Sequence, residues 1–240
     1  MKKIYSFSLI VATGLVVFSG IGCRKSIVDT TPQNDLDNTT FAQVFVATVN
    51  ASRNFVYADG AQINGVALSS GSVFPGTGLY AFTFPAGLRA FLVKDTLPAT
   101  TQVPISFAEN LQLGKNYTIF MYDTITTPKQ KTVLTNIVVP TDSTARLRFA
   151  NFVYNPTAVP GIDIFSYLRN TNVVTDLKVS EVTDFIPYAS GITDTLYIRE
   201  TGTLTNIVKF TSSYTTKRSY TLVYRGSYRG TKLATLFTNR

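Results

Sequence analysis

The residues that could carry out covalent or acid–base chemistry in this chain are few. Its 240 residues include one cysteine, Cys23, and no histidine. The chain therefore lacks the commonest general base and metal ligand, and a single thiol can form neither a disulfide within the chain nor a multi-thiolate metal site. The serines have no histidine partner and no Gly-x-Ser-x-Gly turn. We therefore predict that the protein is not an enzyme and that it uses no metal and no cofactor.

Two weaker signals lack the features that catalysis or phosphate binding would need. Glu109 with Asp123, or Glu181 with Asp184, could form a carboxylate pair, but a glycosidase needs two such groups across a cleft, and nothing in the sequence indicates one. The Pro-Gly-Thr-Gly loop at residues 75–78 lacks the Lys-Ser/Thr and the helix of a phosphate-binding loop.

The candidate ligand contacts lie in a basic hairpin near the C-terminus. Arg225, Tyr228 and Arg229 could hold an anionic glycan or phosphate through guanidinium forks and aromatic stacking. The alternative is an exposed hairpin whose charges prevent association through a sheet edge. Tyr117 and Tyr220 offer a similar choice between sugar stacking and core packing with a hydroxyl that reaches the edge, and we favour packing.

The N-terminal segment has the organisation of an export signal. Lys2 and Lys3 precede an uncharged run, Ile4–Gly22, that ends in small residues directly before Cys23. The tetrapeptide Gly-Ile-Gly-Cys at residues 20–23 resembles the lipobox of bacterial lipoproteins. The resemblance implies that the thiol receives a diacylglycerol, that the chain is cut before the cysteine, and that the new amine is acylated. A signal-anchor helix is the alternative, because the apolar run is close to the lower length limit for crossing a bilayer.

The charge balance limits the expected partners. The formal net charge is +8, of which Lys2 and Lys3 contribute two. A basic balance can indicate an anionic partner, but charged residues make up only 15% of the chain and the basic ones are scattered. We expect the membrane, through lipid on Cys23, and a polysaccharide or an envelope protein as partners, and no nucleic acid.

The body of the chain has the pattern of short β-strands. After Phe41, apolar residues occupy both alternating sets of positions, as in a strand that is apolar on both faces. Asp59-Gly60 and Asn64-Gly65 are typical of hairpin turns, and residues 133–139 are one of the further predicted strands. Because turn signals recur roughly every ten residues, the pattern predicts a β-sandwich.

The pattern begins again after Pro140. At a constant offset of 103 residues, Ala42–Val49 aligns with Ala145–Phe152, and Tyr117 aligns with Tyr220. One offset that serves both ends of a unit indicates a tandem repeat of about 100 residues, the usual size of an immunoglobulin-like sandwich.

Several strand and turn segments resemble the domain-of-unknown-function family 4397. They are Ala-Arg-Leu-Arg-Phe-Ala-Asn at residues 145–151, the strand around Asp163, the segment Leu111–Thr118, and residues 55–60. The family's members are exported or surface domains, often in tandem and often on lipoproteins of Bacteroidetes, and the family supplies no catalytic residues. In the second unit, Lys217 stands where the pattern has glycine.

Together these patterns predict a lipid-anchored outer-membrane protein with two tandem immunoglobulin-like β-sandwich domains. Its role would be non-catalytic, either a glycan-binding or adhesion module or, alternatively, a structural subunit of an envelope complex. The ligand, the side of the membrane and the oligomeric state stay open. The predicted segments are a signal peptide at 1–22, a lipidated tether at 23–40, and sandwiches at 41–140 and 141–240.

Overall fold

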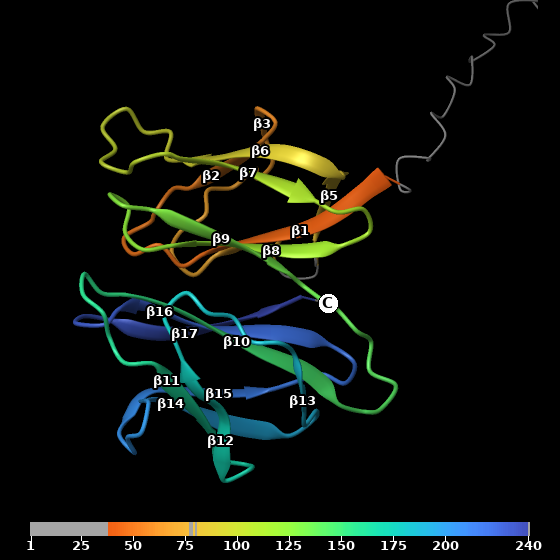
Figure 1. Ribbon diagram of the computed structural model, residues 1–240, viewed down its shortest axis with the longest axis vertical. Coiled ribbons are helices and arrows are strands. Elements are labelled where there is room, and N and C mark those ends of the chain that lie inside the picture. Colours follow the sequence, from red (N-terminus) through yellow and green to blue (C-terminus); the bar gives the residue numbers. More distant parts are fainter. Residues whose placement is uncertain (1–37, 77–78, 80, 240) are drawn as a thin grey trace, which may run out of the picture. The chain divides into compact units, whose positions relative to one another are not determined.

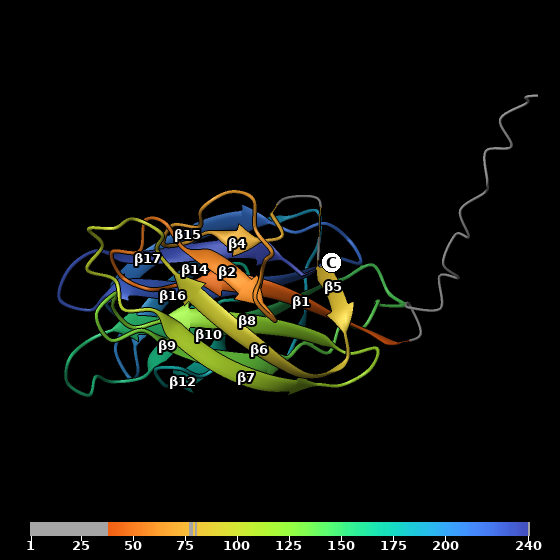
Figure 2. The same cartoon turned by 90° about the horizontal axis from the view of Figure 1, so that it is seen from above.

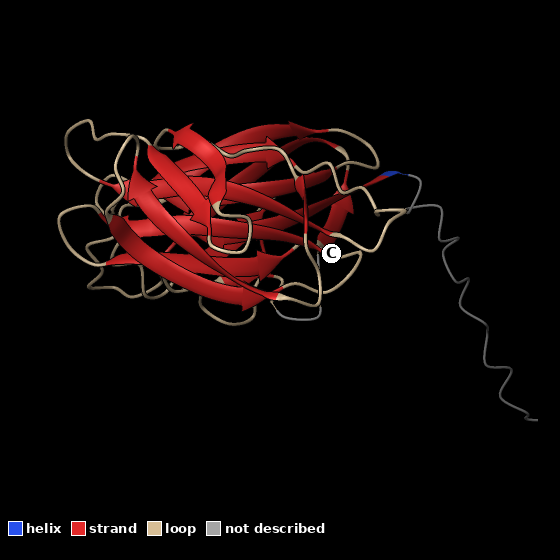
Figure 3. Ribbon diagram, turned by 90° about the horizontal axis from the view of Figure 1, so that it is seen from below, coloured by secondary structure: helices blue, strands red, loops and turns tan. Residues whose placement is uncertain are grey.

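The computed structural model describes residues 38–76, 79 and 81–239, which form strands through much of their length (Figure 3). The predicted signal peptide, Cys23 and nearly all of the predicted tether lie outside the described residues. Among the described residues, no helix has the length and apolarity needed to cross a membrane. The strands are β1 (Thr39–Val46), β2 (Phe55–Ala58), β3 (Ala61–Gln62), β4 (Val73–Phe74), β5 (Phe82–Pro85), β6 (Gly87–Lys94), β7 (Ile105–Leu111), β8 (Asn116–Tyr122), β9 (Lys129–Leu134), β10 (Ala145–Tyr154), β11 (Ile162–Ser166), β12 (Thr171–Leu177), β13 (Ile186–Tyr188), β14 (Thr193–Glu200), β15 (Asn206–Ser213), β16 (Ser219–Ser227) and β17 (Lys232–Thr238).

The strands of the first half form two sheets that enclose a core, and we call this unit the first sandwich (residues 39–134). One sheet has the order β4-β1-β8-β9, with β5 also paired to β1, and the other has the order β3-β2-β6-β7. Alternate residues of each sheet point inward, because successive side chains on a strand face opposite ways. The buried core includes Val44, Val46, Val56, Phe91, Val93, Ile119 and Met121.

The second sandwich (residues 145–238) repeats this arrangement. Its sheets have the orders β13-β10-β16-β17 and β12-β11-β14-β15. In both sandwiches the opening strand runs parallel to a late strand, β1 with β8 and β10 with β16. The predicted all-β sandwich class is therefore confirmed, with this parallel pair at the centre of one sheet. Core residues of the second sandwich include Leu147, Phe149, Ile162, Ile164, Leu196, Ile198, Leu222 and Tyr224.

A third core lies between the two sandwiches, where the sheet of β1, β8 and β9 meets the sheet of β10, β16 and β17 (Figures 1 and 2). The rings of Phe45 and Phe237 stack with centroids 5.1 Å apart, and those of Phe120 and Phe152 stack at 4.6 Å. This packing explains why β1 and β10 are buried on both faces. All the described residues belong to one compact unit.

The repeat does not keep a constant offset of 103 residues. Tyr117 and Tyr220 do correspond at that offset, but their parallel partners are Ala42 and Leu147, which are 105 residues apart. The alignment of Ala42 with Ala145 is therefore wrong by two residues along the strand. Because side chains alternate with a period of two, this shift leaves the inward and outward faces unchanged, and the sequence pattern could not reveal it.

Two local predictions fail and one holds. Asp59 and Gly60 have φ of 49° and 84° and join β2 to β3, as predicted. Asn64 instead has a buried side chain whose Oδ1 accepts from the Val56 N–H at 2.7 Å. The strand predicted at residues 133–139 is β9 (Lys129–Leu134), because antiparallel pairing with β8 places Lys129 opposite Tyr122.

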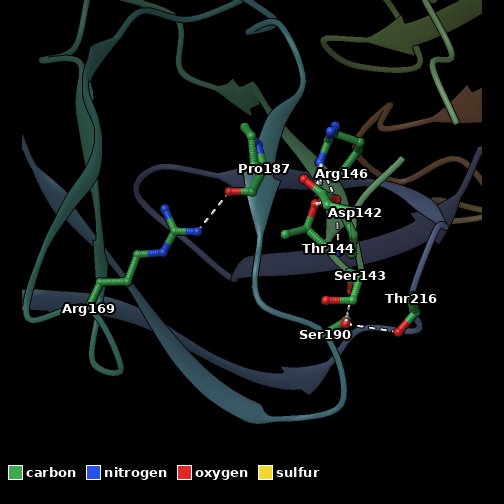
Figure 4. A network of polar contacts seen from close by, with 9 residues as sticks. Asp142, Ser143, Thr144, Arg146, Arg169, Pro187, Ser190 and Thr216 are labelled. Atoms are coloured by element: carbon green, nitrogen blue, oxygen red, sulfur yellow. Dashed lines mark hydrogen bonds and ion pairs between the residues drawn. The ribbon is translucent and has the colours of Figure 1, made fainter. Parts of the chain in front are cut away.

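The connection between the sandwiches is bonded to the second one (Figure 4). The Ser190 hydroxyl donates to the Ser143 carbonyl oxygen and lies 2.9 Å from the Thr216 hydroxyl. Arg146 bonds the Thr144 hydroxyl and lies 3.8 Å from the Asp142 carboxylate. These contacts fix the start of β10, the strand that contributes to both of the hollows described next.

Candidate functional site

Two hollows lie at the junction of the sandwiches, between β9 and residues 178–187, and we call the pair the junction groove. One, of about 470 Å³, lies next to Tyr122 and is called the Tyr122 hollow; the other, of about 460 Å³, lies next to Arg148 and is called the Arg148 hollow. Between them, the Lys131 ammonium donates to the Ser180 carbonyl oxygen at 2.6 Å. Both hollows depend on the packing of one sandwich against the other, since each is lined by residues of both.

The Tyr122 hollow combines aromatic rings with a charged pair. Tyr122 ends β8, Tyr154 ends β10, and both line the hollow. Asp123, held at a φ of 73°, forms an ion pair of 2.6 Å with Lys129 at the start of β9. The hydrogen bond to Asp123 raises the pKa of the Lys129 ammonium, which therefore stays charged at neutral pH.

Amide and ammonium groups complete this hollow. The Asn155 amide nitrogen donates to the carbonyl oxygen and the hydroxyl of Thr157, at 2.9 Å each. Its buried carbonyl oxygen Oδ1 has no hydrogen-bond partner among the described residues. Lys178 on the opposite wall is paired with Asp176 at 2.5 Å. The hollow therefore offers donors, acceptors and aromatic surface to a ligand rich in hydroxyl groups.

The Arg148 hollow contains a buried cation. Arg148 is 2% exposed, and its Nε donates to the Thr221 hydroxyl at 2.8 Å. Its Nη2 donates across the junction to the hydroxyls of Thr118 at 2.8 Å and Thr135 at 3.2 Å. Burial lowers the pKa of Arg148 to about 9, against the opposing charge of Asp184. The guanidinium therefore remains protonated at neutral pH.

The wall of the Arg148 hollow is also polar. Arg146, Asn136 and the exposed Asp184 line it, together with Phe185, whose ring centroid lies 4.8 Å from the Arg148 guanidinium carbon. No carboxylate of the described residues lies within ion-pair distance of Arg148.

The predicted hairpin residues have different surroundings. Arg225 is half-buried, and its guanidinium donates to the hydroxyls of Thr235 at 2.7 Å and Ser70 of the first sandwich at 3.1 Å. Tyr228 bonds the Glu200 carboxylate, which raises the pKa of its hydroxyl. Arg229 is exposed. Two of the three candidates thus already have polar partners within the protein, and a role of this hairpin in ligand contact stays a prediction.

Tyr117 and Tyr220 occupy equivalent positions with equivalent bonds. The Tyr117 hydroxyl accepts from the Gln112 N–H at 2.9 Å, and the Tyr220 hydroxyl accepts from the Thr215 N–H at 3.1 Å. Each bond reaches back five residues, as in the tyrosine corner of immunoglobulin-like sandwiches. The favoured interpretation as packing residues with a hydroxyl at the edge is confirmed.

Three of the four carboxylates considered as catalytic pairs have another partner. Glu109 accepts from Gln130 at 3.2 Å, Asp123 pairs with Lys129, and Glu181 accepts from the Lys178 N–H at 2.8 Å. Asp184 lines the Arg148 hollow. Among the described residues, no group of three acidic, histidine or cysteine side chains could hold a metal ion.

Sequence reasoning missed both hollows. Their residues come from strand ends that meet only when the sandwiches pack, so no spacing along the chain brings them together. One signal was present: Arg146 and Arg148 are the charged residues of a strand that is mostly apolar on both faces. A charged residue in such a strand is rarely buried without a partner, and Arg148 could have been selected on that ground.

Comparison with known proteins assigns the chain to no family. No family model matches the sequence, and no curated protein matches it significantly. A solved carbohydrate-binding module, CBMbc (family CBM26) of Eubacterium rectale Amy13K in complex with maltoheptaose, aligns at 8% identity and a TM-score of 0.26, over 82% of this chain and 95% of its own. The Bacillus anthracis TIE protein aligns at 14% identity and a TM-score of 0.22, over 79% of this chain and 33% of its own. The resemblance to family 4397 stays a prediction.

Proposed function

We propose that this protein is a non-catalytic, lipid-anchored module of the outer membrane that binds a glycan in the junction groove. The observation that carries the proposal is the Tyr122 hollow, where Tyr122, Tyr154, Asn155 and the Asp123–Lys129 pair surround one space. Its volume of about 470 Å³ falls in the range of ligand pockets, roughly 300–1,000 Å³.

The chemistry of the hollow suits a sugar. Tyrosine rings offer an apolar surface and a polar hydroxyl, and the hydroxyl groups of a sugar can both donate and accept hydrogen bonds. Tyr122 and Tyr154 line the hollow together with Lys129 and Lys178, so aromatic and charged polar groups border the same space.

The charge of the groove favours an acidic glycan. Lys129 and Lys178 line the Tyr122 hollow with one carboxylate, Asp123. Arg146 and Arg148 line the Arg148 hollow with one carboxylate, Asp184. Lys131, which bonds Ser180, and Arg148 have no carboxylate within ion-pair distance among the described residues. A groove lined mainly by one sign of charge concentrates ligands of the other sign, more strongly at low ionic strength.

Glycan binding by paired tyrosine variants tests the proposal. A panel of neutral and acidic oligosaccharides is screened by isothermal titration, and the best ligand is measured with Tyr154→Ala and with Tyr167→Ala, an exposed tyrosine outside the groove. We expect Tyr154→Ala to weaken binding about tenfold, equivalent to about 1.4 kcal/mol, and Tyr167→Ala to have no effect. Equal affinity of both variants, or no binding to any oligosaccharide, would contradict the proposal.

An exposed apolar tip keeps the scaffold alternative open. Tyr167 is 70%, Leu168 44% and Ile192 53% exposed. The Tyr167 and Leu168 N–H groups bond Thr195 and Asp194 at the start of β14, close to Ile192. Exposed apolar patches commonly mark contacts between proteins. Loss of a specific envelope partner from a detergent pull-down with Tyr167→Ala, but not with Tyr154→Ala, would favour this second function.

The anchor is tested at Cys23. Mass spectrometry of the mature protein is expected to find a chain that begins at an acylated Cys23, because two acyl chains suffice for stable membrane binding. Cys23→Ser should move the protein from the membrane fraction to the soluble fraction. An unmodified cysteine, or a mature chain that retains Met1, would contradict the anchor.

A further inference from the structure

The two sandwiches contact each other through equivalent residues that differ in charge. Gln43 lies opposite Thr118 in the first parallel pair, and Arg148 lies opposite Thr221 in the second. Gln43 donates to the Thr238 carbonyl oxygen at 3.0 Å and accepts from the Asn239 amide at 2.9 Å. Arg148 makes the reciprocal contact, to Thr118 and Thr135 of the first sandwich. The junction is therefore close to two-fold symmetric, except in this charge.

The charge of Arg148 is not needed to join the sandwiches. Gln43 makes equivalent cross-junction bonds with a neutral amide. Burying a guanidinium costs several kcal/mol unless an anion compensates it. Arg148 bonds three neutral hydroxyls, and its guanidinium also contacts the Phe185 ring. Among the described residues, no carboxylate lies within ion-pair distance of it, the exposed Asp184 included. Stability of the junction alone would be better served by glutamine at both positions.

The space next to Arg148 has the composition of an anion site. Arg148 and Arg146 line one hollow of about 460 Å³, with the Asn136 amide on its wall. Guanidinium groups bind oxyanions through paired N–H donors and are less strongly hydrated than ammonium groups. Asp184 is the acidic residue of that lining, and it would compete with an incoming anion.

We propose that the Arg148 hollow is an oxyanion site that binds a carboxylate, sulfate or phosphate group through Arg148 and Arg146. The inference deepens the proposed function and partly rests on it, because a glycan in the junction groove would supply the group as a substituent. A small oxyanion free in solution would meet the same chemistry, and the experiment separates these two sources.

The test measures the binding of small anions by protein NMR at constant ionic strength. Sodium sulfate, inorganic phosphate and glucuronate are titrated against chloride, and the Arg148 Nε–H resonance reports on the hollow. We expect saturable shifts for the oxyanions and none for chloride. Asp184→Asn should tighten sulfate binding about threefold and Arg146→Gln should weaken it about threefold, the size of one partly screened charge contact.

The matched control is Glu181→Gln, which makes the same charge change on an exposed residue outside the lining of the hollow. It should leave sulfate affinity unchanged. Equal tightening by Glu181→Gln and Asp184→Asn, or shifts that never saturate, would mean non-specific screening and would overturn the site. Arg148→Gln, which copies Gln43, should abolish binding in a folded protein; if it fails to fold, the Asp184 and Arg146 variants still decide.

The two proposals can fail separately. Sulfate binding without any oligosaccharide binding would support the oxyanion site, assign it to a free anion and overturn the glycan proposal. Oligosaccharide binding that is unaffected by Asp184→Asn and Arg146→Gln, with no response to small anions, would support the groove and overturn the oxyanion site. Oligosaccharide binding that competes with sulfate would support both.

Discussion

The first and second sandwiches share a framework but differ in their buried polar groups. The first buries neutral amides: Asn64 bonds the Asn54 carbonyl oxygen at 3.1 Å, and Gln102 bonds the Asn54 side chain. The second buries charged groups, Asp194 and Arg148. A neutral amide network has the same strength across the pH range, whereas a buried ion is stabilising only while it stays charged and partnered. The stability of the second sandwich should therefore depend more on pH than that of the first.

The aromatic residues of the two cores also differ in polarity, with more hydroxyl groups in the second core. Phenylalanines dominate the first, with neighbouring ring centroids 5.0–5.8 Å apart along Phe74, Phe82, Phe84, Phe91 and Phe107. Tyrosines take this place in the second, with edge contacts between Tyr188, Tyr214 and Tyr220. The buried hydroxyls of Tyr214 and Tyr224 have no partner among the described residues. Repeated sheet topology thus fixes where a buried side chain points, but not whether it is polar.

The largest loss of stability is expected from a substitution at the junction, which should also uncouple the unfolding of the two sandwiches. Phe120 is fully buried and packs on Phe45, Phe152 and Phe237. Phe120→Ala removes a ring from the contact between sandwiches and should lower the free energy of unfolding by about 4 kcal/mol. With the junction weakened, the halves should unfold in separate steps. Urea unfolding followed by tyrosine near-UV circular dichroism, which reports mainly on the second core, and by far-UV signal checks this.

One coincident transition in the Phe120→Ala protein would show that the sandwiches remain coupled through their polar contacts. The matched control is Phe107→Ala, which removes a ring of the first sandwich outside the third core. It should destabilise the protein without separating the two transitions.

A smaller effect is expected at Asp194, which carries the pH dependence. Its carboxylate accepts from the Ser166 hydroxyl at 2.5 Å, the Leu168 N–H at 2.8 Å, the Thr195 N–H at 2.6 Å, and the Tyr188 hydroxyl. Burial opposes its charge, but these bonds outweigh burial and hold the pKa of Asp194 below its usual value. Asp194→Asn leaves donors facing an amide and should cost about 3 kcal/mol at pH 7.

The sign of the pH effect follows from that lowered pKa. Stability contributed by Asp194 is complete above the unfolded value, about 3.9, and is lost as the pH falls through the lower folded value. The wild-type second sandwich should therefore lose stability below about pH 4, and the Asp194→Asn protein should lose less over the same range. Parallel pH curves for the two proteins, measured by urea unfolding, would assign the acid sensitivity to another group.

Features that depend on neighbouring residues in the chain could be predicted from the sequence, and features that depend on contacts between distant segments could not. Strand alternation and the Asp59-Gly60 turn are local, and they predicted the sandwich class and the first hairpin. Asn64 resembled a turn residue because its buried bonds to Val56 and Asn54 depend on other strands. Val44 and Phe45 indicated a strand apolar on both faces, but the partner of the outer face, another sandwich, lies about 100 residues away in the chain. Arg148 and Tyr122 acquire their surroundings only from that contact.

The smallest effect concerns one turn that both sandwiches share. Gly114 and Lys217 are equivalent residues before the tyrosine corners, with φ of 68° and 61°. Their N–H groups bond the equivalent carbonyl oxygens of Thr39 and Thr144. Glycine adopts this conformation freely, whereas a residue with a side chain pays about 1 kcal/mol or slightly more. The first sandwich therefore has glycine where this backbone geometry favours it, and the second sandwich is strained at the equivalent residue, Lys217.

Exchanging the two residue types should produce opposite changes at equivalent positions. Lys217 is exposed, so Lys217→Gly removes strain without loss of packing and should raise the free energy of unfolding by about 1 kcal/mol. A Cβ at Gly114 would meet no atom within 4 Å, so Gly114→Ala introduces strain alone and should lower it by about the same amount. Urea unfolding of both proteins and of the double variant measures this. Because the sites lie in different sandwiches, the effects should add. A stabilising Gly114→Ala would contradict the strain argument. A non-additive double variant would show that the two turns are coupled.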